Sequence, residues 1–321
     1  MNPLLTDQPI GVVGLGLLGR GIAASLLANG FRVIGCNRSA KNADVAREHA
    51  KMALEEVVQH LGASPDLPEL VDKNFVTSQD LNDLSKCRFI IESAVESLEE
   101  KRKIFDQLEA VVSPETIIAS NTSALPITIL QTGRKYPERF IGMHWGEPCH
   151  IIRFLEVIRG EKTSDSTAEI TYELGRAAGK DVVMVRKDIR GFITNRLMYA
   201  FLREALYLLE EGIGTVEDID ASFRNDIGTW SPIAGPFRWM DLTGIPAYHA
   251  VLSELAPELC NDKKSADTLR KMAESGAQGV SNQRGFYSYT PEEAIKWEEL
   301  WRDYTWEARR LADKYTPIKN P

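Results

Sequence analysis

The chain has 321 residues, which is long enough for two domains of ordinary size. Apolar residues make up 43% and charged residues 26%, the balance of a folded globular protein rather than a disordered one. With 38 Lys and Arg against 46 Asp and Glu, the formal net charge is -8. That acidity argues against a general nucleic-acid-binding protein, although a local basic pocket for a phosphorylated ligand stays compatible with it.

The cysteines are sparse and form no CxxC pair, so we assign neither a metal site nor a disulfide framework and expect a reducing cytoplasm. They are Cys36, Cys87, Cys149 and Cys260. The first eight residues lack a basic region followed by an apolar one, so we expect no targeting segment. Arg20 and five glycines interrupt the apolar stretch 10–27, so we expect no membrane span.

The first half of the chain alternates short apolar runs with helical patterns. Strands are predicted at residues 10–14, 31–36, 89–93 and 116–119, and helices at 17–29, 40–61 and 98–112. This alternation is typical of a doubly wound parallel sheet covered by helices on both faces. We therefore expect a Rossmann-like α/β domain over residues 1–187.

The pattern becomes purely helical after about residue 187. Helices are predicted at residues 192–211, 216–224, 245–255 and 266–275. We expect an all-helical domain over residues 188–321, with the boundary near 187–191.

A glycine motif follows the first predicted strand and opens the first predicted helix. It consists of Gly14, Leu15, Gly16, Leu17, Leu18 and Gly19 and fits the pattern GxGxxG. In that context the first glycine permits a tight turn, the second lets the backbone approach a pyrophosphate, and the third lets the helix pack on the strand. The sequence therefore predicts a dinucleotide site; the alternative is a glycine-rich turn without a ligand.

The end of the second predicted strand bears on which dinucleotide binds. NAD enzymes usually carry an acid there for the ribose 2′-hydroxyl, whereas this chain has Asn37 and Arg38. Because Arg38 suits a 2′-phosphate, the sequence slightly favours NADP over NAD. The alternative is that Asn37 alone serves NAD and Arg38 is a solvated charge.

A histidine and a glutamate fall on two further predicted strands. The run 139–144 ends in His144, and the run 152–158 places Glu156 in a row with Ile152, Phe154 and Ile158. A buried carboxylate needs a partner, and a His–Glu pair is a common general-base arrangement. The alternative is an ordinary buried ion pair.

Polar residues also stand at two positions where ligands commonly bind. Ser120 and Asn121 come at the carboxyl end of the predicted strand 116–119, and Asn195 lies in the first turns of the helix that opens the second domain. The alternatives are a plain loop or helix cap for the first pair and a cap or interhelical bond for Asn195.

Several motifs, taken in chain order, carry a resemblance to the 3-hydroxyacyl-CoA dehydrogenase family. They are residues 14–19, 94–97, 119–123, His144 with Pro148 and Glu156, 191–197, 235–237 with Asp241, and 285–287. The resemblance runs from about residue 9 to 290. It implies a Rossmann-like domain followed by a helical domain that mediates dimerisation, an NAD(P)-dependent oxidoreductase, and an activity of fatty acid metabolism.

The resemblance also implies roles for individual residues. His144 resembles the catalytic base, and Glu156 resembles the partner that orients it. Ser120 and Asn195 resemble the groups that polarise the substrate oxygen. Glu96 and Lys101, with Asn121 in the neighbouring turn, resemble residues near the nicotinamide and its ribose.

The chain departs from the family pattern at four places. No acid ends the second predicted strand, as noted above. Glu147 stands where a neutral amide is usual. The segment 41–73, which resembles a CoA-recognising arm, is short and carries mixed charges, so it is a poor CoA phosphate site. An extension, 291–321, carries one apolar stripe that we expect to pack on its own domain or a dimer partner. The stripe consists of Trp297, Leu300, Trp301, Tyr304, Ala308 and Leu311.

With these departures, the chain is similar to a branch of the family that acts on a small ring acid in pyridoxine degradation. The leading hypothesis is a dehydrogenase of the 3-hydroxyacyl-CoA type, which oxidises a secondary 3-hydroxy group to a ketone with His144 as base. The alternatives are a dehydrogenase of a small non-CoA hydroxy acid or aldehyde, and a non-catalytic dinucleotide-binding or structural protein. In each case we expect a small-molecule ligand, no nucleic acid, no membrane partner and a homodimer.

Overall fold

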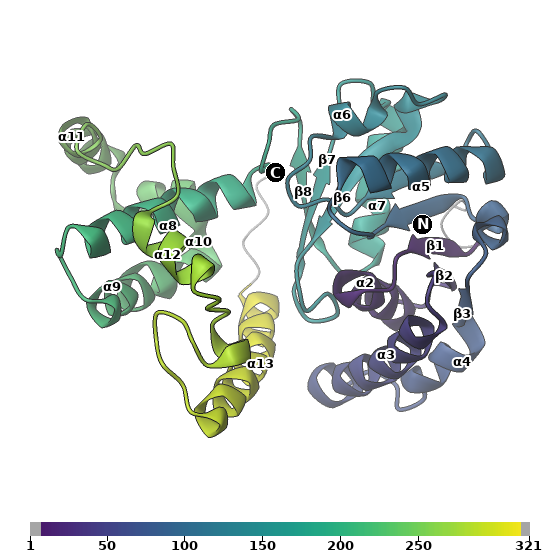
Figure 1. Cartoon of the computed structure of the whole chain (residues 1–321), viewed down its shortest axis with the longest axis horizontal. Helices are drawn as coiled ribbons and strands as arrows, with labels where there is room; N and C mark the ends of the chain where they lie inside the picture. The colour runs from purple at the N-terminus through teal and green to yellow at the C-terminus, as the bar shows by residue number, and fades with distance from the viewer. Residues whose placement is uncertain (1–7, 316–321) are drawn as a thin grey trace. The chain divides into compact units, whose positions relative to one another are not determined.

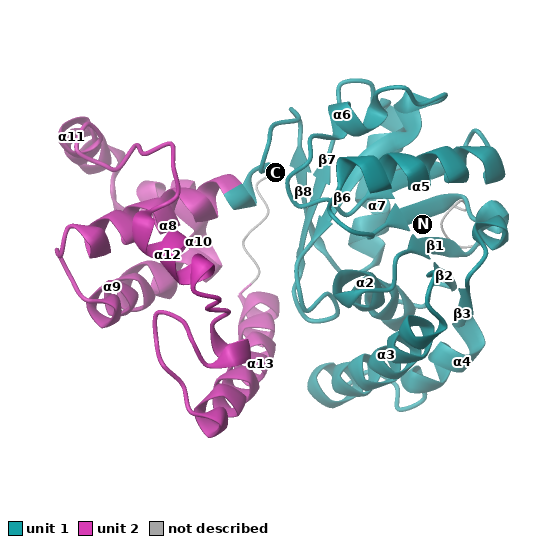
Figure 2. Ribbon diagram, viewed as in Figure 1, with its two compact units in different colours: residues 1–195 teal, residues 196–321 magenta. Residues whose placement is uncertain are grey.

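A computed structural model describes residues 8–315 (Figure 1). The chain divides into two compact units, residues 1–195 and 196–321 (Figure 2). The structure divides the chain after residue 195, whereas the sequence analysis placed the boundary near residue 187.

Unit 1 is built on one eight-stranded sheet. Its strands are β1 (Ile10–Val13), β2 (Val33–Cys36), β3 (Phe75–Ser78), β4 (Phe89–Glu92), β5 (Ile117–Ser120), β6 (Phe140–Trp145), β7 (Phe154–Ile158) and β8 (Asp181–Val185). They lie in the order β3-β2-β1-β4-β5-β6-β7-β8. The pairs from β3 to β6 are parallel, and β6 pairs with β7 in antiparallel fashion. The strand order therefore reverses at β1, where doubly wound sheets bind ligands beyond the carboxyl ends of the strands.

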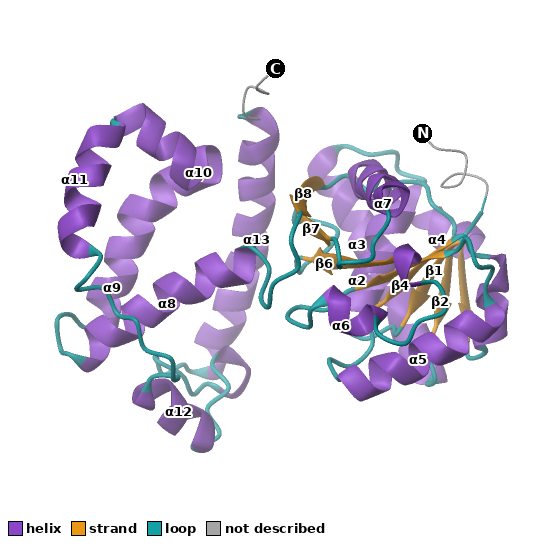
Figure 3. Ribbon diagram, turned by 90° about the horizontal axis from the view of Figure 1, so that it is seen from above, coloured by secondary structure: helices purple, strands orange, loops and turns teal. Residues whose placement is uncertain are grey.

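Helices cover both faces of this sheet (Figure 3). On one face lie α2 (Leu17–Ala28), α3 (Ala40–Leu61), α4 (Leu70–Asn74) and α7 (Asp165–Ala177), packed over alternate strand residues such as Val12 and Val157. On the other lie α5 (Leu98–Val111) and α6 (Ile127–Gln131), packed over the remaining strand residues such as Val13 and Ile158. Two apolar cores thus hold the sheet in place, as the predicted doubly wound α/β fold requires.

The described part of unit 2 consists of helices and loops, apart from two isolated bridges at Arg284. Its helices are α8 (Thr194–Glu210, which begins at the end of unit 1), α9 (Val216–Ser222), α10 (Gly228–Thr243), α11 (Ile245–Leu255), α12 (Asp267–Glu274) and α13 (Pro291–Lys314). The predicted order, a Rossmann-like domain followed by a helical one, is confirmed. None of the described helices is both long and apolar enough to cross a membrane.

The sequence analysis missed two strands, β3 and β8, and four helices, α4, α6, α7 and α10. Strand β3 is short and ends in the polar residues Thr77 and Ser78. Strand β8 does contain an apolar run, residues 182–185, which the sequence analysis did not assign. Helix α10 contains Pro232 and Pro236, which argue against a helix interior, and its chain kinks at Gly235, where φ is 62°.

The aromatic stripe predicted on the C-terminal extension is not the buried face of α13. Trp306 is buried there instead, together with Ala294 and Thr305. Five members of the stripe, Trp297, Leu300, Trp301, Tyr304 and Leu311, are each more than half exposed. Of the two expected positions for this stripe, packing on its own domain is therefore wrong for these side chains, and packing on a dimer partner stays a prediction.

The glycine turn between β1 and α2 is fixed by close backbone contact. Gly14 has a φ of 90°, and a Cβ there would lie 2.7 Å from the carbonyl oxygen of Ser93. A Cβ on Gly19 would lie 1.8 Å from the carbonyl oxygen of Gly14, whereas one on Gly16 would meet nothing within 4 Å. The first and third glycines are thus required for packing, and the second faces open space.

This difference predicts opposite outcomes for two alanine variants. Gly19→Ala forces backbone atoms apart and should lower the free energy of unfolding by about 3 kcal/mol. Gly16→Ala, the matched control, should change it by less than about 1 kcal/mol. Urea unfolding monitored by tryptophan fluorescence measures both, and equal destabilisation by the two variants would contradict the assignment.

Candidate active site

A large pocket surrounds the glycine turn at the switch point of the sheet. It has a volume of about 1050 Å³, and the loops after β1, β2, β4 and β5 line it. Of the residues predicted to hold the cofactor, the lining includes Gly14, Gly16, Leu17, Leu18, Asn37, Arg38, Glu96 and Asn121. Leu15 is buried beneath the turn, and Gly19 packs against Gly14. The open space beside Gly16 and its position as the N-cap of α2, with no side chain capping the helix, fit a pyrophosphate held by backbone amides.

Asn37 helps to build the turn. Its Oδ1 accepts a hydrogen bond from the Leu15 amide at 3.2 Å, and its Nδ2 donates to the Ser39 carbonyl at 3.1 Å. Its side chain thus already has a partner on each polar atom, whereas Arg38 is exposed at the rim of the pocket.

Two carboxylates of the loop after β3 act on the end of β2. Burial, together with the negative charges of Asp80 and Asp83, raises the pKa of the Cys36 thiol to about 11. Asp80 also lines the pocket beside Asn37 and Arg38. Carboxylates near the end of β2 thus come from the segment after β3 and not from β2 itself.

The antiparallel pairing of β6 and β7 brings the predicted catalytic pair together. His144 and Glu156 are directly opposite each other in the register, and Nδ1 of His144 lies 2.9 Å from Oε2 of Glu156. The His144 side chain is 12% exposed and that of Glu156 is fully buried. Phe154 and Phe192 pack edgewise and tilted against the imidazole ring. The ring is thus held by one carboxylate and two aromatic side chains, with Nε2 on its other side.

Glu156 also receives the start of α8. Its Oε1 accepts hydrogen bonds from the amides of Ile193 and Thr194 at 3.1 and 2.8 Å. Burial alone would raise the pKa of this carboxyl, but the His144 and amide hydrogen bonds outweigh it and hold the pKa below its usual value. Glu156 is therefore an anion at neutral pH. Because its pKa is lower in the folded than in the unfolded state, it stabilises the fold above its unfolded-state pKa. This contribution to the free energy of unfolding is lost as the pH falls through the folded-state pKa.

Ser120 does not reach this pair. Its side chain is 3% exposed, and its hydroxyl donates to Oε2 of the buried Glu92 at 2.6 Å. The exposed serine of the same turn is Ser123, whose carbonyl oxygen accepts a hydrogen bond from Nδ2 of Asn195 at 2.7 Å. The buried hydroxyl of Ser120 therefore does not fit the predicted role of polarising a substrate oxygen. Ser123, and not Ser120, is the serine that contacts Asn195.

Lys101 likewise does not line the pocket. Its side chain is fully buried, and Nζ lies 2.8 and 2.9 Å from the two carboxylate oxygens of Glu92 and 3.4 Å from Oε2 of Glu96. The predicted contact of Lys101 with a cofactor is thus replaced by a contact with two glutamates. Glu92 was missed by the sequence analysis, although a carboxylate that ends an apolar central strand is a signal for it.

Asn121 joins three strand ends. Its Oδ1 accepts from the amide of Trp145 at 3.1 Å, and its Nδ2 donates to the hydroxyl of Ser93 at 3.0 Å. Because Trp145 follows His144 in β6, Asn121 connects the pocket with the strand that carries the histidine.

Glu147 points toward α2. Its Oε2 lies 3.1 Å from where a Cβ on Gly21 would be, and the Cys149 thiol donates to it at 3.5 Å. Burial raises the pKa of Glu147. The carboxyl group of Glu147, which replaces the amide usual in the family, is therefore partly buried beside α2.

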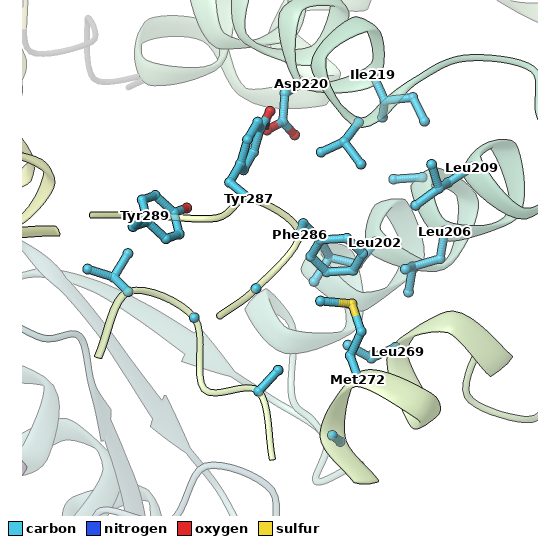
Figure 4. Close-up of a pocket in the computed structure, with 17 residues that line it drawn as sticks. Leu202, Leu206, Leu209, Ile219, Asp220, Leu269, Met272, Phe286, Tyr287 and Tyr289 are labelled. Carbon is cyan, nitrogen blue, oxygen red and sulfur yellow. Dashed lines mark hydrogen bonds between the residues drawn. The ribbon is translucent and has the colours of Figure 1, made fainter. Parts of the chain in front are cut away.

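A second cavity lies wholly within unit 2 (Figure 4). It has a volume of about 470 Å³ and is lined mainly by apolar side chains of α8, α9 and α12, such as Leu206 and Met272. Its polar feature is Tyr287, whose hydroxyl donates to Asp220 at 2.9 Å. The sequence analysis predicted no such cavity.

Two family models match nearly the whole chain. The model of the 3-hydroxyacyl-CoA dehydrogenase NAD binding domain matches residues 9–189, and that of the C-terminal domain of the same enzyme matches residues 191–289.

Curated relatives include enzymes with and without CoA-linked substrates in their names. The 5-formyl-3-hydroxy-2-methylpyridine 4-carboxylate (FHMPC) 5-dehydrogenase of Mesorhizobium japonicum is 35% identical over 285 residues, covering 88% of this chain and 91% of that protein. The 3-hydroxybutyryl-CoA dehydrogenase of Bradyrhizobium diazoefficiens is 37% identical over 292 residues, covering 88% and 95%.

Solved structures give the same two kinds of relative. A crystal structure of FHMPC 5-dehydrogenase, described as an NAD+ dependent dismutase, superposes with a TM-score of 0.89 at 33% identity, covering 95% of this chain and 98% of that one. The (S)-3-hydroxybutyryl-CoA dehydrogenase of Ralstonia eutropha gives a TM-score of 0.74 at 30% identity, covering 88% and 99%. The chain therefore belongs to the 3-hydroxyacyl-CoA dehydrogenase family and is an NAD-dependent dehydrogenase.

Proposed function

We propose that this dehydrogenase oxidises a small hydroxy acid or aldehyde that is not linked to CoA, with His144 as the base. The observation that carries the chemistry is the pair of His144 and the buried Glu156 at 2.9 Å, on the strand that Asn121 ties to the dinucleotide pocket. The carbon to be oxidised bears a hydroxyl group, either an alcohol or the hydrate of an aldehyde.

In this proposal Nε2 of His144 takes the hydroxyl proton. Glu156 keeps the imidazole proton on Nδ1 and stabilises the imidazolium that forms. The Asn195 amide and the Ser123 hydroxyl orient the substrate oxygen, a role that the sequence analysis gave to Ser120. A nicotinamide cofactor held in the pocket would supply the acceptor for the hydride that leaves the same carbon.

The substrate class is supported by the charges of the segment 41–73. Three of its basic residues are already paired: Arg47 with Asp72 at 2.9 Å, Lys51 with Asp72 at 3.3 Å, and Lys73 with Glu69 at 2.8 Å. A CoA phosphate would have to displace these carboxylates, and the remaining acids of the segment would repel it. The similarity to FHMPC 5-dehydrogenase, whose named substrate is a free acid, points in the same direction.

A 3-hydroxyacyl-CoA substrate is the second candidate. The similarity that favours it is the 37% identity with 3-hydroxybutyryl-CoA dehydrogenase. It would place the chain in fatty acid metabolism.

A substrate panel separates the two. We expect NADH formation with small carboxylated alcohols or aldehydes, and a kcat/KM at least about a hundredfold lower with 3-hydroxybutyryl-CoA, because the phosphate contacts are missing. A higher kcat/KM with the CoA thioester would contradict the proposal in favour of the second candidate.

The roles of the pair predict a graded loss of activity. His144→Ala should lower kcat by about a thousandfold, and Glu156→Gln by about a hundredfold, since the glutamine keeps the shape but not the charge. Cofactor affinity, measured by titration, should stay within about threefold for both variants. His144→Ala with a kcat near that of the unmodified enzyme would show that another group is the base.

We propose NAD+ rather than NADP+ as the physiological cofactor, against the slight preference that the sequence analysis drew from Arg38. The support is the negative charge of Asp80 and Asp83 at the end of β2, together with the use of Asn37 within the turn. A 2′-phosphate would meet these carboxylates as well as Arg38.

Titration of the two reduced cofactors tests this choice. We expect NADH to bind at least about tenfold more tightly than NADPH, and Asp80→Asn to narrow that ratio because it removes a repulsive charge. A preference for NADPH that disappears in Arg38→Ala would restore the original interpretation.

We propose that the chain forms a homodimer through α10 and α11. Six apolar side chains of these helices are each more than half exposed: Ile233, Phe237, Leu242, Ile245, Val251 and Leu252. Many large apolar side chains exposed on two consecutive helices are typical of an association surface. Light scattering should give twice the chain mass of 35.9 kDa, and Phe237→Glu should halve it; a monomer in both would contradict the proposal.

We also propose a reducing cytoplasm as the location. Three of the four cysteines, Cys36, Cys87 and Cys149, are buried free thiols. Intact-mass analysis after alkylation in the absence of reductant should find all four thiols reduced in the protein freshly released from its cells; a disulfide would contradict it.

A further inference from the structure

Glu92 is the centre of a buried network at the carboxyl end of β4. Its carboxylate accepts hydrogen bonds from Nζ of Lys101, from the hydroxyl of Ser120 and from the amide of Ala94, the last at 2.7 Å. Its carbonyl oxygen accepts from the amide of Asn121 at 2.7 Å. One residue thus holds the loops that follow β4 and β5 in a single arrangement.

Lys101 is shared between two carboxylates. Beyond its pair with Glu92 it lies 3.4 Å from Glu96, whose carboxylate also accepts from the Thr122 hydroxyl and from the amides of Ser123 and Ala124. Burial alone would raise the pKa of Glu96, but these hydrogen bonds and Lys101 lower it. Two carboxylates and one ammonium leave the group with a net charge of about -1.

This net charge faces one end of the dinucleotide pocket. Glu96 is the exposed member, with 41% of its side chain accessible, and it lines the pocket, whereas Glu92 and Lys101 are fully buried. Two other charged residues of α5, Glu100 and Lys103, line the pocket and pair with each other at 2.9 Å. Lys103 also pairs with Glu99 at 2.8 Å, so these groups of α5 add no positive charge that would offset Glu96.

The opposite end of the same pocket is formed by Asn37 and Arg38, after β2. In a doubly wound fold the adenosine ribose binds after the second strand and the pyrophosphate at the glycine turn. The Glu96 end is therefore left for the nicotinamide. It also adjoins Asn121, which contacts the amide next to His144, so the reactive ring and the base lie toward the same strand end.

We propose that Glu92, Lys101 and Glu96 act as one net-negative unit that favours the oxidised cofactor over the reduced one, with Glu96 as the member that discriminates. The physical reason is that the nicotinamide ring carries a positive charge in NAD+ and none in NADH. A fixed negative group beside it therefore attracts only one of the two forms. This inference rests on the cofactor binding in this pocket, which the family assigns.

The test compares the dissociation constants of NAD+ and NADH in the full chain. NADH is titrated by its fluorescence and NAD+ by calorimetry. In Glu96→Gln, which keeps an oxygen to accept from Thr122, the ratio Kd(NAD+)/Kd(NADH) should rise about fivefold, mainly through weaker NAD+ binding. In the unmodified chain the same ratio should rise with added salt, and in Glu96→Gln it should respond less.

Two variants control for effects other than the loss of the Glu96 charge. Thr122→Val removes a hydrogen bond to Glu96 but keeps its charge, so the ratio should stay within about twofold. Glu99→Gln makes the same chemical change on α5 at an exposed carboxylate paired with Lys103, outside the pocket lining, and should also leave it unchanged.

An unchanged ratio in a folded Glu96→Gln variant would overturn the proposal, even if both affinities fall together. A fall in the ratio would overturn it as well. Failure of the unmodified chain to bind either nucleotide would instead contradict the cofactor assignment itself, and with it this inference.

Discussion

The geometry of the site depends on one buried carboxylate, that of Glu156. One of its oxygens holds Nδ1 of His144, and the other accepts the amides of Ile193 and Thr194 where α8 begins. A buried anion of this kind is stable only when its lone pairs are filled, and removing one partner typically costs about 3–5 kcal/mol. The same contacts that keep Glu156 ionised therefore fix the imidazole and the start of the helix that leads into the second unit.

The change of strand direction makes this contact possible. Strands β1 to β6 run in parallel and deliver their polar ends to one edge of the sheet, where the glycine turn and the loops after β4 and β5 form the pocket. Strand β7 runs the other way, and its register with β6 places Glu156 directly opposite His144. Asn121 then joins the histidine strand to the loop after β4, which brings the base and the cofactor pocket to the same side.

Much of unit 1 was predictable because its signals are local. The glycine pattern, the helix at residues 40–61 and the period-two row around Glu156 all follow from neighbouring residues in the chain. The side-chain partners were not local. The hydroxyl of Ser120 donates to Glu92, twenty-eight residues away, and the ammonium of Lys101 lies between two glutamates. These partners are set by the packing of the strands and helices, so the spacing of residues in the sequence could not predict them. Helix α10 was missed for a different reason: Pro232 and Pro236 argue against one continuous helix, and the chain does kink at Gly235, directly before Pro236.

The central claim is that Glu156 holds the proton of His144 on Nδ1 and leaves Nε2 free to accept one from the substrate. Nitrogen-15 NMR of the histidine-labelled protein at neutral pH measures this directly, with His144→Gln to assign the signal. We expect a protonated Nδ1 and an unprotonated Nε2, and loss of that preference in Glu156→Gln. A proton found on Nε2 in the unmodified protein would contradict the assignment of His144 as the base.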